Sequence, residues 1–204
     1  IDGDEERYGF NPLPREPLER SLEAARKGVR IDANDSFTHQ YLASAYFHNG
    51  STFLFRRHAK VALELNPNDA DLLADLGWRF SFLSDWAGGI PLVQKAIMLN
   101  PGHPAWYRGV LALYYYLIEE YEQARDHSEA YFQPDVLLSH IVRVAIRART
   151  GPQVEAEELL QDMLARFPDF IDSPRSNMRS WRIPEDLINQ LMTGLEMAGL
   201  KLTS

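Results

Sequence analysis

Residues that could do chemistry are few in this sequence, and their spacing is not typical of a catalytic site. A phosphate-binding loop needs a glycine-rich stretch followed by Lys and then Ser or Thr, so that backbone amides surround the phosphate. Gly88 and Gly89 form a glycine pair, but no such residues follow them. We therefore interpret this pair as a small site where two helices pack closely.

Acid–base and nucleophilic catalysis find no better support. Ser139 and His140 are adjacent on an expected helix, where neighbouring side chains point in different directions. The carboxylate pairs Glu119-Glu120 and Glu157-Glu158 are expected where helices begin, a place where negative charge complements the helix dipole. General acid–base work needs a desolvated carboxylate, and nothing in these pairs indicates one. We predict no catalytic residues and a protein that is not an enzyme.

Metal and cofactor sites are not expected either. The sequence has no cysteine, which excludes disulfides, thiolate catalysis and cysteine zinc sites. The histidines do not form an i, i+4 ligand pair, and none has a nearby carboxylate in a metal-binding spacing: His39, His48, His58, His103, His127 and His140. We interpret them as solvated residues on the surface of repeats.

Composition and charge are those of a globular protein. The 204 residues are 45% hydrophobic and 25% charged, and 21 basic against 29 acidic residues give a net charge of −8. This balance argues against a nucleic-acid or anionic-membrane surface. One local exception is the basic cluster Arg56-Arg57-His58 with Lys60. We interpret it as a solvated face, with docking of an acidic partner segment as the alternative.

The first residues of the chain and its longest apolar run indicate where the protein is located. The chain starts with the acidic stretch Ile1 to Glu6, which has no initiator Met and no features of a secretory signal. The longest uncharged apolar run, Gly109 to Ile118, is about half as long as a bilayer span. We expect a cytoplasmic fragment of a larger protein, without a membrane segment.

The elements that must position any functional residue follow a repeat. Ala33, Pro67, Pro101, Pro134 and Pro168 are separated by 34, 34, 33 and 34 residues. A shared pattern precedes each closing position, most clearly in residues 59–67 and 95–101. A fixed period of this length is the signature of a repeat architecture.

The sequence pattern predicts two helices in each repeat. In residues 41–46 and 75–80, a large apolar residue, a small one (Ala43 or Gly77) and an aromatic three positions later share one helical face. The small residue lets a neighbouring helix approach. A closing proline ends the second helix, and Asp35 and Asp69 are expected to cap the next one.

This pattern resembles the tetratricopeptide repeat (TPR), a helix–turn–helix unit of 34 residues. The resemblance implies an all-α fold, a right-handed TPR superhelix or α-solenoid. We expect one domain over residues 1–204: an extended leader (1–16), a half repeat (17–35), a loop with a capping helix (171–204), and four full repeats at 36–69, 70–103, 104–136 and 137–170.

A narrower resemblance rests on residues 99–107 and on the tail, Trp181 to Asp186 with Gly194 to Leu200. These stretches are similar to the C-terminal TPR regions of bacterial class III adenylate/guanylate cyclases and of regulators with a TolB-like domain. That resemblance implies the non-catalytic, regulatory end of a larger signalling protein. Glu196-Met197 stands where that family carries an Arg-Lys pair.

The resemblance also implies a partner-binding groove, because the first helices of TPR repeats line a concave surface. The expected groove residues are mainly aromatic with a few polar groups, a mixture that suits peptide recognition: Gln40, Ser44, Phe47, His48, Asp71, Trp78, Ser81, Phe82, Arg108, Tyr115, Tyr116 and Arg149. Two alternatives remain open. The aromatic residues could belong to the core, or the chain's own C-terminal segment could fill the groove.

The function that follows is a non-catalytic module that binds a protein or peptide in this groove. Chaperone-tail binding is not expected, because Ser44 and Gln40 stand where the carboxylate clamp of some TPR domains has Asn and Lys. One alternative is self-association, since a half repeat at residues 17–33 leaves a face for a second copy. Another is a groove enzyme or a small-ligand sensor. No nucleic-acid partner is predicted.

Overall fold

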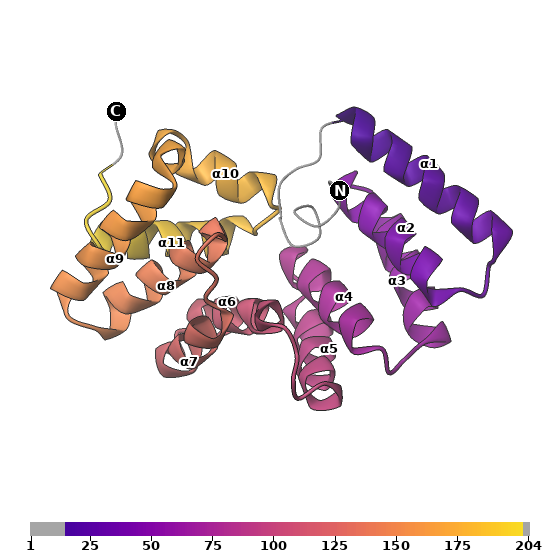
Figure 1. The fold of residues 1–204 in the computed structure, drawn as a ribbon, viewed down its shortest axis with the longest axis horizontal. Coiled ribbons are helices and arrows are strands. Elements are labelled where there is room, and N and C mark those ends of the chain that lie inside the picture. The colour runs from indigo at the N-terminus through magenta and orange to yellow at the C-terminus, as the bar shows by residue number, and fades with distance from the viewer. Residues whose placement is uncertain (1–14, 202–204) are drawn as a thin grey trace. The chain divides into compact units, whose positions relative to one another are not determined.

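The computed structural model describes residues 15–201, and the regular elements in this range are all helical (Figure 1). The first five helices are α1 (Arg15–Ile31), α2 (Ser36–His48), α3 (Thr52–Leu65), α4 (Ala70–Phe82) and α5 (Trp86–Leu99). The 3-10 helix η2 (Ala105–Arg108) leads into α6 (Gly109–Leu117), α7 (Tyr121–Tyr131), α8 (Leu137–Thr150) and α9 (Gln153–Arg166). The last elements are η3 (Pro168–Asp172), α10 (Pro174–Ser180) and α11 (Glu185–Met197).

The described chain divides into two compact units. The N-terminal unit spans residues 15–81 and 85–102, and the C-terminal unit spans residues 82–84 and 103–201. Each unit has its own apolar core, with Leu42, Phe55 and Leu76 fully or almost fully buried in the first and Leu113, Ile141 and Leu191 in the second. No helix in the described range is both long and apolar enough to cross a membrane.

The predicted helix caps at Asp35 and Asp69 are confirmed, whereas Glu157 and Glu158 lie inside α9 and not at its start. The Asp35 carboxylate accepts hydrogen bonds from the backbone N–H groups of Phe37 (3.1 Å) and Thr38 (3.2 Å), and Asp69 accepts one from Leu72 (3.0 Å). These side chains satisfy amides that the first helical turn leaves unpaired. Helices α3, α5 and α9 each end two residues before a closing proline.

The predicted small site between paired helices is also confirmed. A Cβ atom added to Gly77 in α4 would lie 2.8 Å from the carbonyl oxygen of Gly89 in α5, and one added to Gly89 would lie 2.5 Å from the carbonyl oxygen of Gly77. The two backbones therefore approach more closely than any side chain would permit. Gly89 is buried, whereas Gly88 is exposed and donates its backbone N–H to Asp85 (3.0 Å).

A recurrent turn joins the helices of a pair. Gly50, Ser84 and Glu119 have φ values of 80°, 61° and 64°, in the left-handed region. In the last pair Arg182 has the same conformation, with φ 62°, between α10 and α11. At Gly50, Glu119 and Arg182 the backbone N–H donates to the carbonyl three residues earlier. Helices α10 and α11 thus form a hairpin built like the others, with a short first helix.

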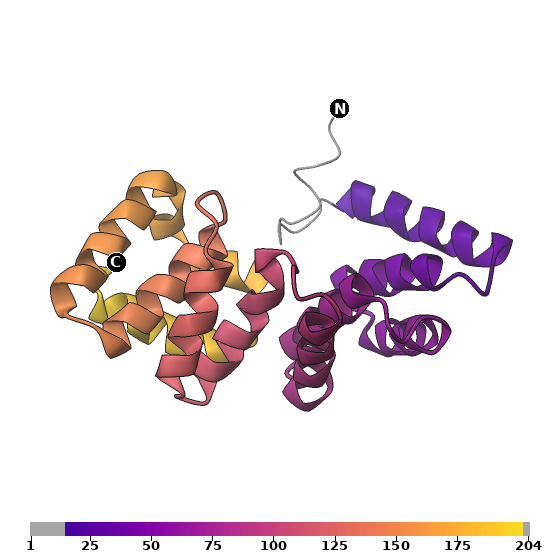
Figure 2. The ribbon, with the colours of Figure 1, turned by 60° about the horizontal axis from the view of Figure 1, so that its bottom comes forward.

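The C-terminal region contains more helix than the sequence analysis expected. Residues 169–183, predicted to be non-periodic, contain part of η3 and all of α10. The last helix was predicted at residues 186–198 and is found at Glu185–Met197. It packs along α8 and also contacts α6, while α9 packs on another side of α8 (Figures 1 and 2). The apolar side of α11 determines this position, because its largest side chains there are fully buried: Leu187, Ile188, Leu191, Met192 and Leu195.

The expected half repeat is a single helix, α1, which packs on α2. Gly28 allows this approach, since a Cβ atom there would lie 3.0 Å from the Thr38 methyl group. The Arg26 guanidinium donates to the Tyr46 hydroxyl (3.2 Å) and lies over the Tyr46 ring. The expected leader, residues 1–16, lies outside the described residues up to position 14.

Candidate functional site

Five of the twelve expected groove residues are buried and present almost no surface to a partner. Their exposed fractions are 3% or less, and the five are Phe47, Trp78, Ser81, Phe82 and Tyr116. The alternative interpretation, in which aromatic residues of the pattern belong to the core, therefore applies to them.

Specific contacts explain three of these burials. Phe47 packs edge-on against Phe55 of α3, with ring centroids 5.7 Å apart. The Ser81 hydroxyl donates to the carbonyl of Gly77 (2.9 Å). It faces the close crossing of α4 and α5, where there is no space for a ligand. The Tyr116 hydroxyl donates to the carbonyl of Gln190 in α11 (2.9 Å).

The remaining expected residues are at least partly exposed. In the N-terminal unit these are Gln40, Ser44, His48 and Asp71, and in the C-terminal unit Arg108, Tyr115 and Arg149.

A polar network connects α2 and α4 in the N-terminal unit. Gln40 donates to the Asp75 carboxylate (3.1 Å), and Arg79 pairs with the same carboxylate one helical turn along α4. Arg79 also donates to the Ser44 hydroxyl (2.6 Å) and lies over the ring of Phe47. The network contains one carboxylate and one guanidinium, so the two charges balance.

This network is only partly shielded from water. The side chains of Arg79 and Asp75 are 14% and 24% exposed, and the Arg79 Nε atom is buried without a hydrogen-bond partner among the described residues. Because this ion pair is partly shielded from solvent, it holds the side chains hydrogen-bonded to it, Gln40 and Ser44, in a defined geometry. It fixes the register of α2 against α4.

Two exposed aromatic residues adjoin the network, and sequence reasoning missed them. Phe37 and Tyr41 are 51% and 60% exposed, and their ring centroids are 5.7 Å apart on α2. With Ser44 and His48 they follow the spacing i, i+4, i+7 and i+11, which is one stripe of a helix. We define the α2–α4 face as this stripe with the neighbouring polar residues: Phe37, Gln40, Tyr41, Ser44, His48, Asp71, Asp75 and Arg79.

The corresponding face of the C-terminal unit is filled by α11. A Cβ atom added to Gly194 would lie 2.6 Å from the Tyr116 hydroxyl and 2.7 Å from the Cβ atom of Ala145 in α8. Gln190 returns a hydrogen bond from its side chain to the carbonyl of Leu117 (3.2 Å). The alternative in which the chain's own C-terminal segment fills the groove therefore holds for the α6–α8 face.

Arg149 lies at the edge of this filled face. Its guanidinium is beside the Tyr116 hydroxyl and over the ring of Tyr121, at 5.9 Å from the ring centroid. Burial raises the pKa of Tyr116, although the neighbouring Arg149 acts in the opposite direction. The phenol is therefore a neutral hydrogen-bond donor to α11.

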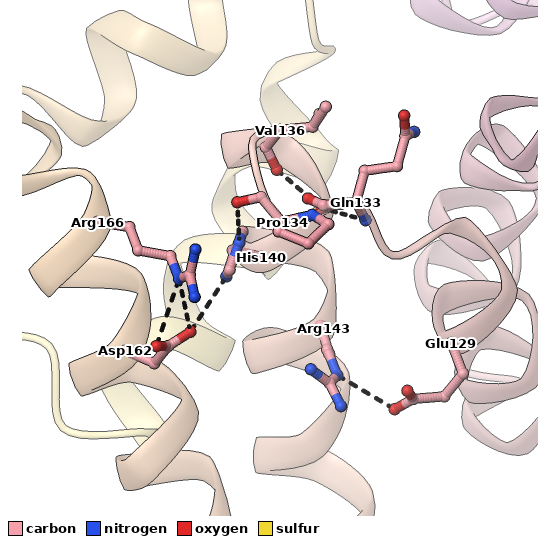
Figure 3. A network of polar contacts seen from close by, with 9 residues as sticks. Glu129, Gln133, Pro134, Val136, His140, Arg143, Asp162 and Arg166 are labelled. Atoms are coloured by element: carbon pink, nitrogen blue, oxygen red, sulfur yellow. Dashed lines mark hydrogen bonds and ion pairs between the residues drawn. The ribbon is translucent and has the colours of Figure 1, made fainter.

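Ser139 and His140 both contact backbone carbonyls of the turn before α8. The Ser139 hydroxyl lies 2.8 Å from the carbonyls of Gln133 and Val136. His140 Nε2 donates to the carbonyl of Pro134 (2.9 Å), and its Nδ1 faces Asp162 at 4.0 Å (Figure 3). These groups anchor the turn before α8.

An equivalent histidine occurs in the first repeat. His39 Nε2 lies 3.2 Å from the carbonyl of Ala33, which is again six residues earlier, at the closing position of the preceding repeat. Both histidines are buried, so their interpretation as solvated surface residues was wrong for these two. The six-residue spacing from Ala33 and from Pro134 was the signal that could have found them.

The basic cluster on α3 is divided between contacts within the unit and solvent. Arg56 pairs with Asp85 (2.5 Å) and lies over the Phe80 ring. His58 Nδ1 faces His39 Nδ1 at 3.0 Å, and burial, with His39 and Arg57 nearby, lowers the pKa of His58 to about 4. Lys60 and Arg57 are exposed, in agreement with a solvated face. The described residues contain no group of His, Asp and Glu side chains that could hold a metal ion.

No protein-family model matches the chain, and no curated protein matches it. Among solved structures, one of MamA is 19% identical, with a TM-score of 0.58 over 78% of this chain and 87% of that chain. A second MamA structure is 20% identical, with a TM-score of 0.59 over 74% and 90% of the two chains.

A third similar structure is that of YrrB, described as a TPR protein with an unusual peptide-binding site. It is 14% identical, with a TM-score of 0.60 over 86% of this chain and 93% of that chain. Identities this low establish the fold and nothing finer. Together with the paired helices, the closing prolines and the small crossing sites, they show that this chain has the TPR fold that its sequence predicted.

Proposed function

We propose that this chain is a non-catalytic protein-interaction module that binds a peptide segment of a partner on the α2–α4 face. The observation that carries the proposal is the exposed pair Phe37 and Tyr41 beside the half-buried network of Gln40, Asp75 and Arg79. Rigid aromatic side chains next to fixed polar groups are typical of peptide-binding surfaces.

Two features elsewhere in the molecule favour the α2–α4 face as the binding site. Helix α11 fills the α6–α8 face, so a partner peptide has no access there. The accessible side of α1 is charged, with Arg20, Glu23, Lys27 and Arg30 on it, so self-association through an apolar face is not part of the proposal. The described peptide-binding site of YrrB gives a precedent for peptide recognition by this fold.

Selection from a random peptide library on the whole chain tests this function. We expect selected peptides to lose affinity at least tenfold in Phe37→Ser or Tyr41→Ser, because each change removes an exposed ring from the face. Phe53→Ser is the matched control: Phe53 is 78% exposed on α3 and lies outside the face. Peptides that respond to Phe53 and not to the other two residues would contradict the proposal.

The wider setting is proposed on the sequence resemblance. We place the module in the cytoplasm, at the regulatory end of a larger bacterial signalling protein of the cyclase type. Reading the gene upstream of the Ile1 codon tests this placement. A catalytic or DNA-binding domain in frame would agree with it, and a start codon within a few residues would contradict it.

A further inference from the structure

A second recognition feature lies in the C-terminal unit, around Arg108. This residue ends η2, immediately before α6, and its side chain is half-buried. Its Nε atom lies 3.3 Å from His103 Nε2, and one terminal nitrogen lies 3.5 Å from His127 Nδ1. The Tyr115 ring stacks on the His127 ring, with centroids 5.3 Å apart and planes 6° apart.

These contacts define the protonation of both imidazoles. His103 Nδ1 lies 2.9 Å from the carbonyl of Pro104 and therefore carries a hydrogen. Its Nε2 is then the acceptor for Arg108. A guanidinium has only donors, so His127 Nδ1 is also an acceptor, and the His127 hydrogen is on Nε2. Burial, followed by the neighbouring Arg108, lowers the pKa of His127, which favours the same neutral form.

Arg108 therefore lacks a counter-charge within the described chain. Its hydrogen-bond acceptors there are two neutral imidazole nitrogens, which leave most of its five N–H groups unused. The acidic residue that affects this cluster is Asp126, which acts on His127. Most other arginines of this unit differ in this respect: Arg125, Arg143, Arg147, Arg166 and Arg179 each pair with a carboxylate.

We propose that Arg108, with His127 and Tyr115 beside it, binds a glutamate or aspartate side chain of the partner protein. This inference rests on the proposed function, because it names the chemistry of a second contact with the same partner. Arg108 supplies the charge and a planar pair of donors that matches a carboxylate. The stacked ring of Tyr115 holds the His127 imidazole beside Arg108.

Charge balance favours a carboxylate over a phosphate. With both histidines neutral, the cluster carries a single positive charge, which one carboxylate neutralises. A phosphoryl group carries about −1.5 to −2 at pH 7 and would leave excess negative charge in a half-buried site, near Asp126.

The test is an NMR titration of the full chain. The probes are three capped peptides of the same length that differ at one central position, which is glutamate, glutamine or phosphoserine. The observed signals are the imidazole nitrogens of His103 and His127 and the side-chain N–H of Arg108. The variants are Arg108→Gln and Arg108→Lys, with Arg125→Gln as the matched control, since Arg125 pairs with Glu122 in the same unit.

We expect the glutamate peptide to shift these three signals and to bind at least tenfold more tightly than the glutamine peptide. Arg108→Gln should abolish this difference, Arg108→Lys should keep part of it, and Arg125→Gln should leave it unchanged. In the unmodified chain, which needs no variant to fold, the difference in affinity between the glutamate and glutamine peptides is itself the test.

Other outcomes would overturn the inference. Equal affinity for the glutamate and glutamine peptides would exclude a carboxylate as the ligand of Arg108. Tighter binding of the phosphoserine peptide would assign the site to phosphate. Binding that appears only after residues 1–10 are removed would assign it to the chain's own acidic segment. Tyr41→Ser should not alter this titration, so a failure at Arg108 is distinguishable from a failure at the α2–α4 face.

Discussion

The position of α11 gives the most stringent prediction, the effect of replacing Gly194 by valine. Gly194 is buried where α11 crosses α6 and α8. An added Cβ atom would lie 2.6 Å from the Tyr116 hydroxyl, 2.7 Å from the Ala145 Cβ atom and 2.8 Å from the Ala145 Cα atom. Two of these three atoms cannot move by side-chain rotation, because they belong to the backbone or are attached directly to it.

The expected magnitude follows from two opposing effects. Each contact is about 1 Å shorter than a normal separation of about 3.5–4.0 Å, and overpacking of a core costs about 1–3 kcal/mol. Valine has a higher helix propensity than glycine, which offsets only a few tenths of a kcal/mol. The larger branches of valine extend further into α8. We therefore expect Gly194→Val to lower the free energy of unfolding by about 2–3 kcal/mol.

The assay is urea denaturation followed by far-UV circular dichroism, with amide hydrogen exchange to localise the effect. The matched control is Thr193→Val, which places the same side chain one residue earlier, at an exposed position of α11. It should change stability by no more than about 0.5 kcal/mol. Exchange should accelerate in α11, α8 and α6 of the Gly194 variant but not in α2.

Equal stability of the two variants would refute this reasoning. It would mean that α11 does not cross α8 at Gly194, and that the α6–α8 face is open to a partner. The restriction of the proposed binding site to the α2–α4 face would then lose its basis.

Three further predictions concern other parts of the fold. The free energy of unfolding should fall as the pH decreases from 6.5 to about 4, because His58 binds a proton more readily in the unfolded chain than in the folded one. The pKa shift corresponds to about 3 kcal/mol, which the partial exposure of His58 reduces to about 1–2 kcal/mol. Urea denaturation at pH 7 and at pH 4.5 should show a smaller difference in stability for His58→Asn than for the unmodified chain. Glu119→Gly should stabilise the chain by about 1 kcal/mol, since Glu119 has φ 64°, whereas Glu120→Gly, at φ −81°, should destabilise it by about 0.5–1 kcal/mol in the same assay. Gly89→Val should lower the melting temperature clearly, with a cost of about 3 kcal/mol, because its Cβ atom would meet the Gly77 carbonyl; an unchanged melting temperature would contradict the close crossing of α4 and α5.

The helix pairs were predictable because each repeat carries its own local signals. A closing proline, a capping aspartate and a small residue at the crossing act within about 34 residues, and Asp69, Gly77 and Pro101 do in the structure what their types suggest. The left-handed turns were less visible. Gly50 indicates one, but Ser84 and Glu119 adopt the same conformation without glycine, because the packing of the paired helices determines the turn.

The exposure of the groove residues was not predictable in the same way. Trp78 and Ser44 occupy equivalent positions of their repeats, yet one is buried and the other partly exposed. The apolar side of α11 shows that this helix buries one face, but not which surface receives it. The pair Asp75 and Arg79 has the i, i+4 spacing of a helical ion pair and could have been recognised from sequence.

The contact of α11 with α6 has a consequence for how the protein forms during synthesis. The N-terminal unit is built from neighbouring helices, so its contacts can form as each repeat leaves the ribosome. The hydrogen bond from Tyr116 to Gln190 spans 74 residues. Until the last hairpin has been translated, the apolar residues of α6 and α8 remain uncovered. For that interval the nascent C-terminal unit exposes apolar surface that α11 covers in the folded chain.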